Sequence, residues 1–153
     1  MRQTSRHFLF CAVASLGLAL PCLAATPAAE LQVRIGYLAY IPETGPLLSN
    51  VIPEPADAGL RGAELAITDS NSTGRFLNQS YSLESASVDT PEALLAAAQA
   101  QHAEGLRLFV VNAPAASLRQ LSAALPDSLL FNAGSADDRL RNTECLLNVL
   151  HSL

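Results

Sequence analysis

The side chains that could do chemistry gather in three turns of the chain. Each turn follows an apolar run and combines small residues with hydroxyl or amide groups. The three turns are Tyr40–Leu48, Asn112–Ser117 and Asn132–Asp138. Small residues let a ligand approach the backbone, and free N–H groups at the start of a following helix suit a carboxylate. Ser, Asn, Gly and Pro are also ordinary turn formers, and on composition alone that is the better explanation.

Residue patterns typical of catalysis are absent. The sequence has no GxxxxGK, GxGxxG or GxSxG motif. His102 and His151 have no metal-ligand partner at useful spacing. The neighbouring residues Asp137 and Asp138 are expected to point apart at a solvated helix start, where they cannot share acid–base work. We therefore expect no enzyme activity, no cofactor and no metal site.

The amino-terminal residues resemble a secretory leader. Arg2 and Arg6 precede Phe8–Leu20, a run of thirteen residues without a charge, and small residues at 22–24 permit cleavage between Ala24 and Ala25. A membrane anchor is the alternative, but a spanning helix needs about 20 apolar residues. We predict a cleaved signal peptide at 1–24, a linker at 25–30 and a periplasmic location.

Residues 25–153 have the length of one domain and an acidic composition. They contain seven arginines, no lysine and fourteen acidic residues, a formal charge of about −7. This charge and the shortage of aromatic residues argue against binding to nucleic acid or an anionic membrane. Cys145 is the one cysteine outside the leader, and beside Leu146 and Leu147 we expect it to be buried.

Strand and helix patterns alternate along residues 31–153. The first strand should be buried on both faces, the second is more polar and should lie near an edge, and the third is almost wholly apolar and should be central. The predicted strands are Leu31–Tyr40, Tyr81–Val88, Leu106–Val111 and Ser128–Asn132, with Leu146–Leu150 as a candidate fifth strand. The predicted helices run from a cap at Asp57 to about Ser70, ended by Asn71–Gly74; from Thr90 to Glu104; and through Leu118, Leu121 and Leu125.

This order, β-α-β-α-β-α-β, predicts an α/β fold with an open, mostly parallel sheet and helices on both faces. The carboxyl ends of parallel strands meet at one edge of the sheet, and ligands bind in the crevice outside that edge. The three polar turns are therefore expected to lie together.

Several motifs, in their order, resemble the type I periplasmic binding proteins of the branched-chain amino acid transporter family. After the predicted first strand comes Thr44-Gly45-Pro46, and the predicted first helix contains Gly62–Ala66 (GAELA). The ends of the family's third and fourth strands are resembled by the segments FVVNAP and FNAGSADDRLRN. The terminal stretch with Cys145 and NVLHSL is most similar to a subgroup linked with quinoprotein alcohol oxidation. The resemblance covers nearly all of residues 31–153.

The resemblance implies a solute receptor of an ABC-type import system that binds an amino acid or small carboxylate and delivers it to a membrane permease. Family members have two lobes that close on the ligand, and residues 31–153 correspond to the first, so we expect the second lobe to be absent and the receptor incomplete. The family's ligand loops imply a pocket formed by Tyr40, Ile41, Asn112, Ala113, Pro114, Gly134 and Ser135, with Ser117 as a possible addition.

Two other functions stay open at this point. A lobe without its partner could serve only as an interaction or structural domain that binds no solute, because it would leave an apolar sheet end exposed. A small enzyme of flavodoxin-like layout ranks last, since the motifs it needs are missing.

Overall fold

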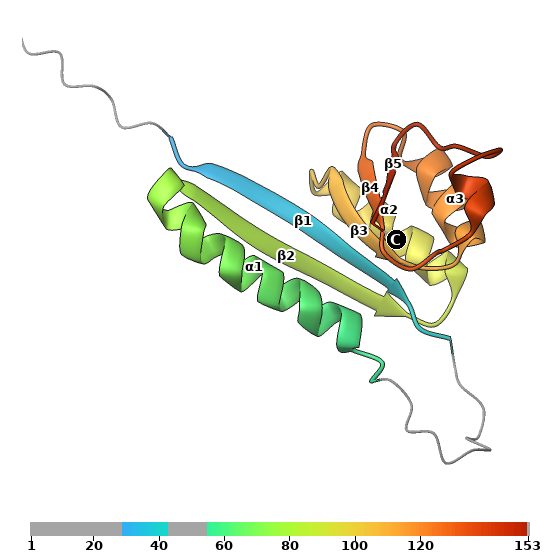
Figure 1. Cartoon of the computed structure of the whole chain (residues 1–153), viewed down its shortest axis with the longest axis horizontal. Coiled ribbons are helices and arrows are strands. Elements are labelled where there is room, and N and C mark those ends of the chain that lie inside the picture. Colours follow the sequence, from blue (N-terminus) through green and yellow to red (C-terminus); the bar gives the residue numbers. More distant parts are fainter. Residues whose placement is uncertain (1–28, 43–54, 153) are drawn as a thin grey trace, which may run out of the picture.

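The computed structural model describes residues 29–42 and 55–152. They form a five-stranded, all-parallel sheet with helices (Figure 1), which confirms the predicted α/β class. The sheet order is β2-β1-β3-β4-β5. The elements are β1 (Leu31–Tyr40), α1 (Ala58–Leu77), β2 (Gln79–Val88), α2 (Pro91–Ala103), β3 (Leu108–Asn112), α3 (Ala115–Ala124), β4 (Leu129–Asn132), the 3-10 turn η1 (Asp138–Leu140) and β5 (Val149–His151).

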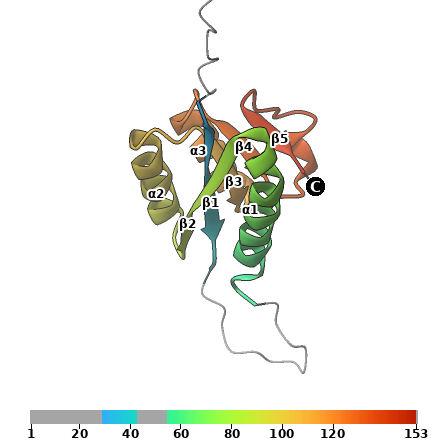
Figure 2. The same ribbon diagram turned by 90° about the vertical axis from the view of Figure 1, so that its left-hand side faces the viewer.

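Helices lie on both faces of the sheet, as predicted. One face packs against α2 and α3, and the buried core forms there from apolar residues of these helices and of β1, β3, β4 and β5. α1 packs mainly on β2 from the other face, and Figure 2 shows α1 and α2 on opposite sides of the β1–β2 pair. β2 is an edge strand and β3 is central, which confirms both predicted positions.

The strand β1 has its predicted bounds but is buried on both faces over only part of its length. Gly36–Ala39 are buried, whereas Leu31 is 55% exposed. β3 begins to pair with β1 only at Ile35, so the first four residues of β1 have β2 as their sole neighbour in the sheet. In Figure 1 the long β1–β2 pair and α1 accordingly extend beyond β3–β5.

The helix α1 is longer than predicted and begins differently. Asp57 makes no capping hydrogen bond; its carboxylate instead accepts from Nε of Arg61 at 2.7 Å. The expected breaker Asn71–Gly74 lies inside the helix, which ends at Asn78 in the left-handed conformation (φ 56°). Asn71 pairs with the backbone of Tyr81 through both ends of its amide, at 2.8 Å each. The side chain that would favour a turn is therefore used to join the helix to β2.

The helix α2 follows its predicted chemistry. Thr90 has extended dihedral angles and its hydroxyl accepts from the backbone N–H of Ala93 at 3.2 Å, while Pro91 and Glu92 occupy the first turn. Gly105 stops the chain after the helix with φ 97°, a conformation that favours glycine. His102 lies in the last turn as expected, and its Nε2 pairs with Asp127 at 2.8 Å.

The carboxyl-terminal segment turns twice before β5, and this exposes Cys145, contrary to the expected burial. Asn148 holds the segment in place: its amide accepts from the hydroxyl of Ser122 at 2.5 Å and donates to the carbonyls of Leu125 and Ser128 at 2.9 and 3.1 Å. Leu146 packs against the core, so its neighbour Cys145 points outward. The predicted fifth strand exists, as Val149–His151.

Among the described residues, one face of β3, β4 and β5 carries apolar side chains that no helix covers. α1 makes its main contacts with β2, and its first turn approaches β3 at Asn112, where a Cβ atom on Gly59 would lie 3.3 Å from Nδ2 of that residue. The residues on this face are half-buried or exposed, unlike their neighbours on the core side. They are Leu108, Val110, Leu129, Phe131 and Leu150.

Candidate functional site

The loops after β1, β3 and β4 meet at the carboxyl edge of the sheet and line an open hollow of about 500 Å³. The part of the first turn beyond Pro42, up to Leu48, lies outside the described residues. Segments far apart in the sequence therefore contribute to one site, because parallel pairing brings all three strand ends to the same edge. The lining residues are Tyr40, Pro42, Asn112, Ala113, Pro114, Ala115, Gly134, Ser135, Ala136 and Asp137.

The second and third loops touch through Gly134. A Cβ atom at this position would lie 2.5 Å from Oδ1 of Asn112 and 2.6 Å from the backbone nitrogen of Ala113. Such distances are below any ordinary van der Waals contact, so a side chain at 134 would force the loops apart. Glycine here lets the two loops share one wall of the hollow.

The third loop is held in shape by Asn132, which is completely buried. Its Oδ1 accepts from the backbone N–H of Ser135 at 2.9 Å, and its Nδ2 donates to the carbonyl of Ser135 at 2.7 Å. Nδ2 also lies 2.9 Å from Nδ1 of His151. This network fixes the backbone of Gly134 and Ser135 against β5.

The first turn of α3 begins at the hollow. Its N-cap is Pro114, which offers no side-chain acceptor, and the first turn holds no acidic residue. Ala115 lines the hollow, whereas Ala116 is exposed outside it. Among the described residues no side chain caps the backbone N–H groups of this turn, and these groups carry the partial positive charge of the helix start.

One carboxylate lies at the rim of the hollow. The hydrogen bond from the Arg139 side chain, together with the Arg139 backbone N–H and the nearby Arg119, lowers the pKa of Asp137 to about 2. Arg139 reaches Asp137 at 2.7 Å and Arg119 lies 4.0 Å away. Arg119 also pairs with Glu144 at 2.9 Å, so it ties the rim to both α3 and the terminal segment. Asp137 is thus ionised at neutral pH and its charge is shared with two arginines.

Six of the eight residues that the sequence analysis selected line this hollow, namely Tyr40, Asn112, Ala113, Pro114, Gly134 and Ser135. Ile41 lines a separate, smaller hollow with Ser87, Val88 and Asp89. Ser117 is buried in the first turn of α3 and does not reach the hollow surface. Asp137 is the polar lining residue that the selection missed; its position two residues after Ser135 in the same turn was the available signal.

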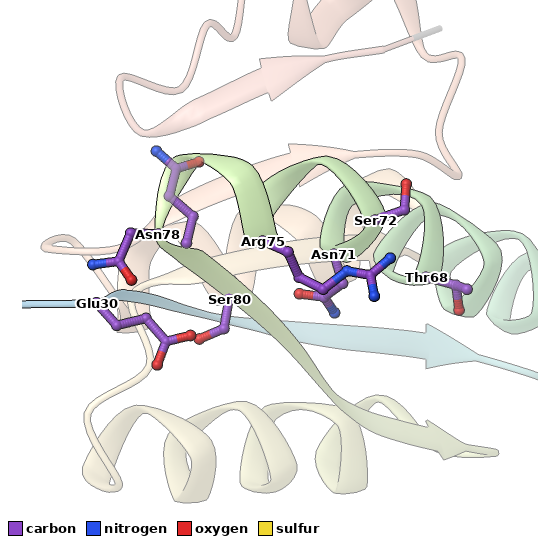
Figure 3. Close-up of a pocket in the computed structure, with 8 residues that line it drawn as sticks. Glu30, Thr68, Asn71, Ser72, Arg75, Asn78 and Ser80 are labelled. Carbon is purple, nitrogen blue, oxygen red and sulfur yellow. The ribbon is translucent and has the colours of Figure 1, made fainter.

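A second hollow, of about 600 Å³, lies at the opposite, amino end of β1 and β2. Figure 3 shows that its side chains come from α1 (Thr68, Asn71, Ser72 and Arg75), from the start of β2 and its preceding turn (Asn78 and Ser80), and from Glu30 ahead of β1. It was not foreseen from the sequence. Ligands of open parallel sheets bind at the carboxyl edge, so we regard the first hollow as the candidate solute site.

The described part of the chain contains no group of three His, Cys, Asp or Glu residues that could hold a metal ion. Within the same residues, no helix has both the length and the apolar character to span a membrane. Comparison with models of known protein families finds no match, and comparison with curated protein sequences finds none either.

Proposed function

We propose that this chain is a non-catalytic solute-binding domain and serves as the substrate-binding component of an ABC-type import system. The observation that carries the proposal is the hollow at the carboxyl edge of the sheet, where three loops and the uncapped start of α3 converge. Its volume of about 500 Å³ suits a small molecule.

The start of α3 favours a carboxylate-bearing solute such as an amino acid or a small organic acid, and the carboxylate of Asp137 at the rim is already paired with Arg139 and lies near Arg119. The free N–H groups of α3 attract a negative group, and the amide of Asn112 and the hydroxyl of Ser135 add polar contacts. Tyr40, Pro42 and Pro114 supply an apolar wall for the rest of the solute.

The transport role rests on the family resemblance and on the amino-terminal leader. A cleaved leader would deliver the domain to the periplasm, where a receptor passes its solute to a membrane permease. The hollow is open to one side, so a second lobe or another chain closing over it would complete the enclosure of the ligand.

Thermal unfolding with a panel of amino acids and small organic acids tests the proposal. A ligand at one hundred times its dissociation constant stabilises the folded state by about 2.7 kcal/mol, which raises the midpoint by several degrees. Ala115→Asp would place a carboxylate at the start of α3 inside the hollow and should abolish the ligand-induced shift. Ala116→Asp adds the same charge to the same turn outside the hollow and should preserve it.

A second candidate function is an interaction domain that binds no solute. The uncovered apolar face of β3–β5 favours it, because apolar surface of this kind commonly marks a protein contact. A cooperative transition that no solute shifts in either the parent protein or Ala116→Asp would contradict solute binding and support this second function.

A further inference from the structure

The outer edge of β2 offers backbone groups that are ready to pair with another strand. The backbone carbonyls of Asn78 and Val88 accept hydrogen bonds from the backbone N–H groups of Leu31 and Ile41. The N–H and C=O groups of the even-numbered residues of β2 therefore point toward β1. The backbone N–H and C=O groups of successive residues in a strand point to alternate sides. The outward-pointing groups of β2 therefore belong to residues 79, 81, 83, 85 and 87. Asn71 takes both groups of Tyr81. In the described part of the chain, Leu83, Ser85 and Ser87 have no strand on that side.

From Leu83 onward, beyond the part of the edge that Asn71 of α1 covers, β2 lacks the sequence features by which proteins usually prevent strand addition. Residues 79–88 contain no proline and no lysine, and no bulge interrupts their register with β1. The single charge in the strand, Glu84, is bound by Arg34 at 2.6 Å on the α2 side of the sheet. The open backbone groups of Leu83, Ser85 and Ser87 thus belong to residues with uncharged side chains, which would not repel a partner strand.

We propose that β2 pairs with β2 of a second copy of this chain, antiparallel and around a two-fold axis at Ser85. In this register Ser85 faces Ser85 of the other copy, and Leu83 faces Ser87, so every outward peptide at 83–87 obtains a partner. Two copies of such an edge can pair with each other, because each outward N–H group of one copy meets an outward C=O group of the other. The β2 strand of the second copy would end at its Val88. This end would lie next to Tyr81 of the first copy, whose outward backbone groups are already bonded to Asn71.

Charges outside the paired residues favour the same register. The antiparallel arrangement places Asp89, the residue after β2, opposite Tyr81 of the other copy, and the turn that leads into α2 with Glu92 follows toward the amino end of that copy's β2. Asn78 and Arg75 line the same hollow at the amino end of β2 (Figure 3), so a cation would meet these acids. Within the described residues, Arg75, Asp89 and Glu92 make no salt bridge in the single copy. The 600 Å³ hollow would then receive the Asp89–Glu92 turn of the partner.

Light scattering coupled to size-exclusion chromatography of the purified protein tests the pairing. We expect a concentration-dependent dimer. Ser85→Pro removes an outward N–H from each copy without touching the bonds to β1 and should yield monomer, whereas Ser85→Ala keeps the N–H and should remain dimeric. Circular dichroism would verify that each variant is folded.

A charge pair provides a test that does not depend on proline being tolerated. Ser85→Lys and Ser85→Glu each place like charges opposite one another and should weaken the dimer by about five-fold. An equimolar mixture of the two should form a heterodimer at least as stable as the parent dimer. Ala123→Lys adds the same charge at an exposed position of α3 and should leave the dimer unchanged.

The electrostatic contact is tested separately by Arg75→Glu, which should weaken the dimer, and by the double variant Arg75→Glu with Glu92→Arg, which should restore it. A protein that is monomeric at all concentrations overturns the proposal. So does a dimer that is insensitive to Ser85→Lys and Ser85→Glu, because its interface would then lie elsewhere. Neither outcome bears on solute binding at the other edge of the sheet.

Discussion

Gly134 lies in direct contact with the backbone of Asn112: a Cβ atom on Gly134 would be 2.9 Å from the carbonyl carbon of Asn112. The same atom would be 2.6 Å from the next backbone nitrogen, of Ala113. Two loops that are separated by the whole of α3 and β4 therefore share one surface, and the candidate solute site depends on that contact.

We expect Gly134→Ala to destabilise the protein by about 1–3 kcal/mol, because the methyl group meets backbone atoms that cannot rotate away. The variant should also reduce the thermal shift caused by any solute that binds the hollow. Gly62→Ala is the matched control: a Cβ atom there meets nothing within 4 Å, and alanine in a helix interior should stabilise by about 0.5–1 kcal/mol. Urea unfolding of both variants gives the comparison; equal midpoints would contradict the loop contact.

Asn132→Ala should destabilise the protein strongly, by about 1–3 kcal/mol for each buried group that loses its partner. The backbone N–H and carbonyl of Ser135 and the Nδ1 of His151 all depend on this amide. Asn142→Ala removes the same side chain from an exposed position and should change the free energy of unfolding by less than about 0.5 kcal/mol. Chemical denaturation of the pair measures the difference, and similar losses in both would refute a special role for Asn132.

The charge of Asp137 should contribute to stability in a defined range of pH. Its folded-state pKa is about 2, below the ordinary value of 3.8, so the contribution is complete above about pH 4 and is lost as the pH falls through 2. Asp137→Asn should therefore show a shallower decrease of stability between pH 4 and pH 2 than the parent protein. Urea midpoints across this range measure the slope. The difference in slope between the parent protein and Asp137→Asn should shrink in high salt, since the carboxylate is near the surface. Equal slopes in the two proteins would contradict the pairing of Asp137 with Arg139.

The thiol of Cys145 should react with an alkylating reagent in the native protein, because it is exposed. Peptide mass spectrometry after labelling identifies the site independently of the leader cysteines. Cys145→Ser should leave the free energy of unfolding within about 0.5 kcal/mol of the parent value. Labelling that occurs only after denaturation would show that the thiol is protected.

Local rules account for the parts of the fold that the sequence predicted well. The Thr90-Pro91-Glu92 start and the Gly105 stop of α2 depend on contacts within a few residues, and both appear as expected. The order of apolar runs along the chain was enough to predict a parallel sheet with an edge position for β2. Strand ends of a parallel sheet necessarily share an edge, so the sequence was enough to predict that the three polar turns lie together; the individual residues came from the family resemblance, and six of them line the hollow.

Tertiary contacts decided what local patterns could not. Asn71 and Gly74 are typical of a helix end, yet Asn71 bonds to Tyr81 and Gly74 packs closely against the carbonyl of Gln79, so the helix continues to Leu77. Cys145 has the neighbours of a buried residue, yet the amide of Asn148 and the core position of Leu146 turn it outward. Residue types and their spacing determined which elements form and where the loops gather. The bonds between distant residues determined how long α1 is, which side chains face water, and how Asp137 comes to lie at the rim of the hollow, because such bonds exist only once the chain has folded.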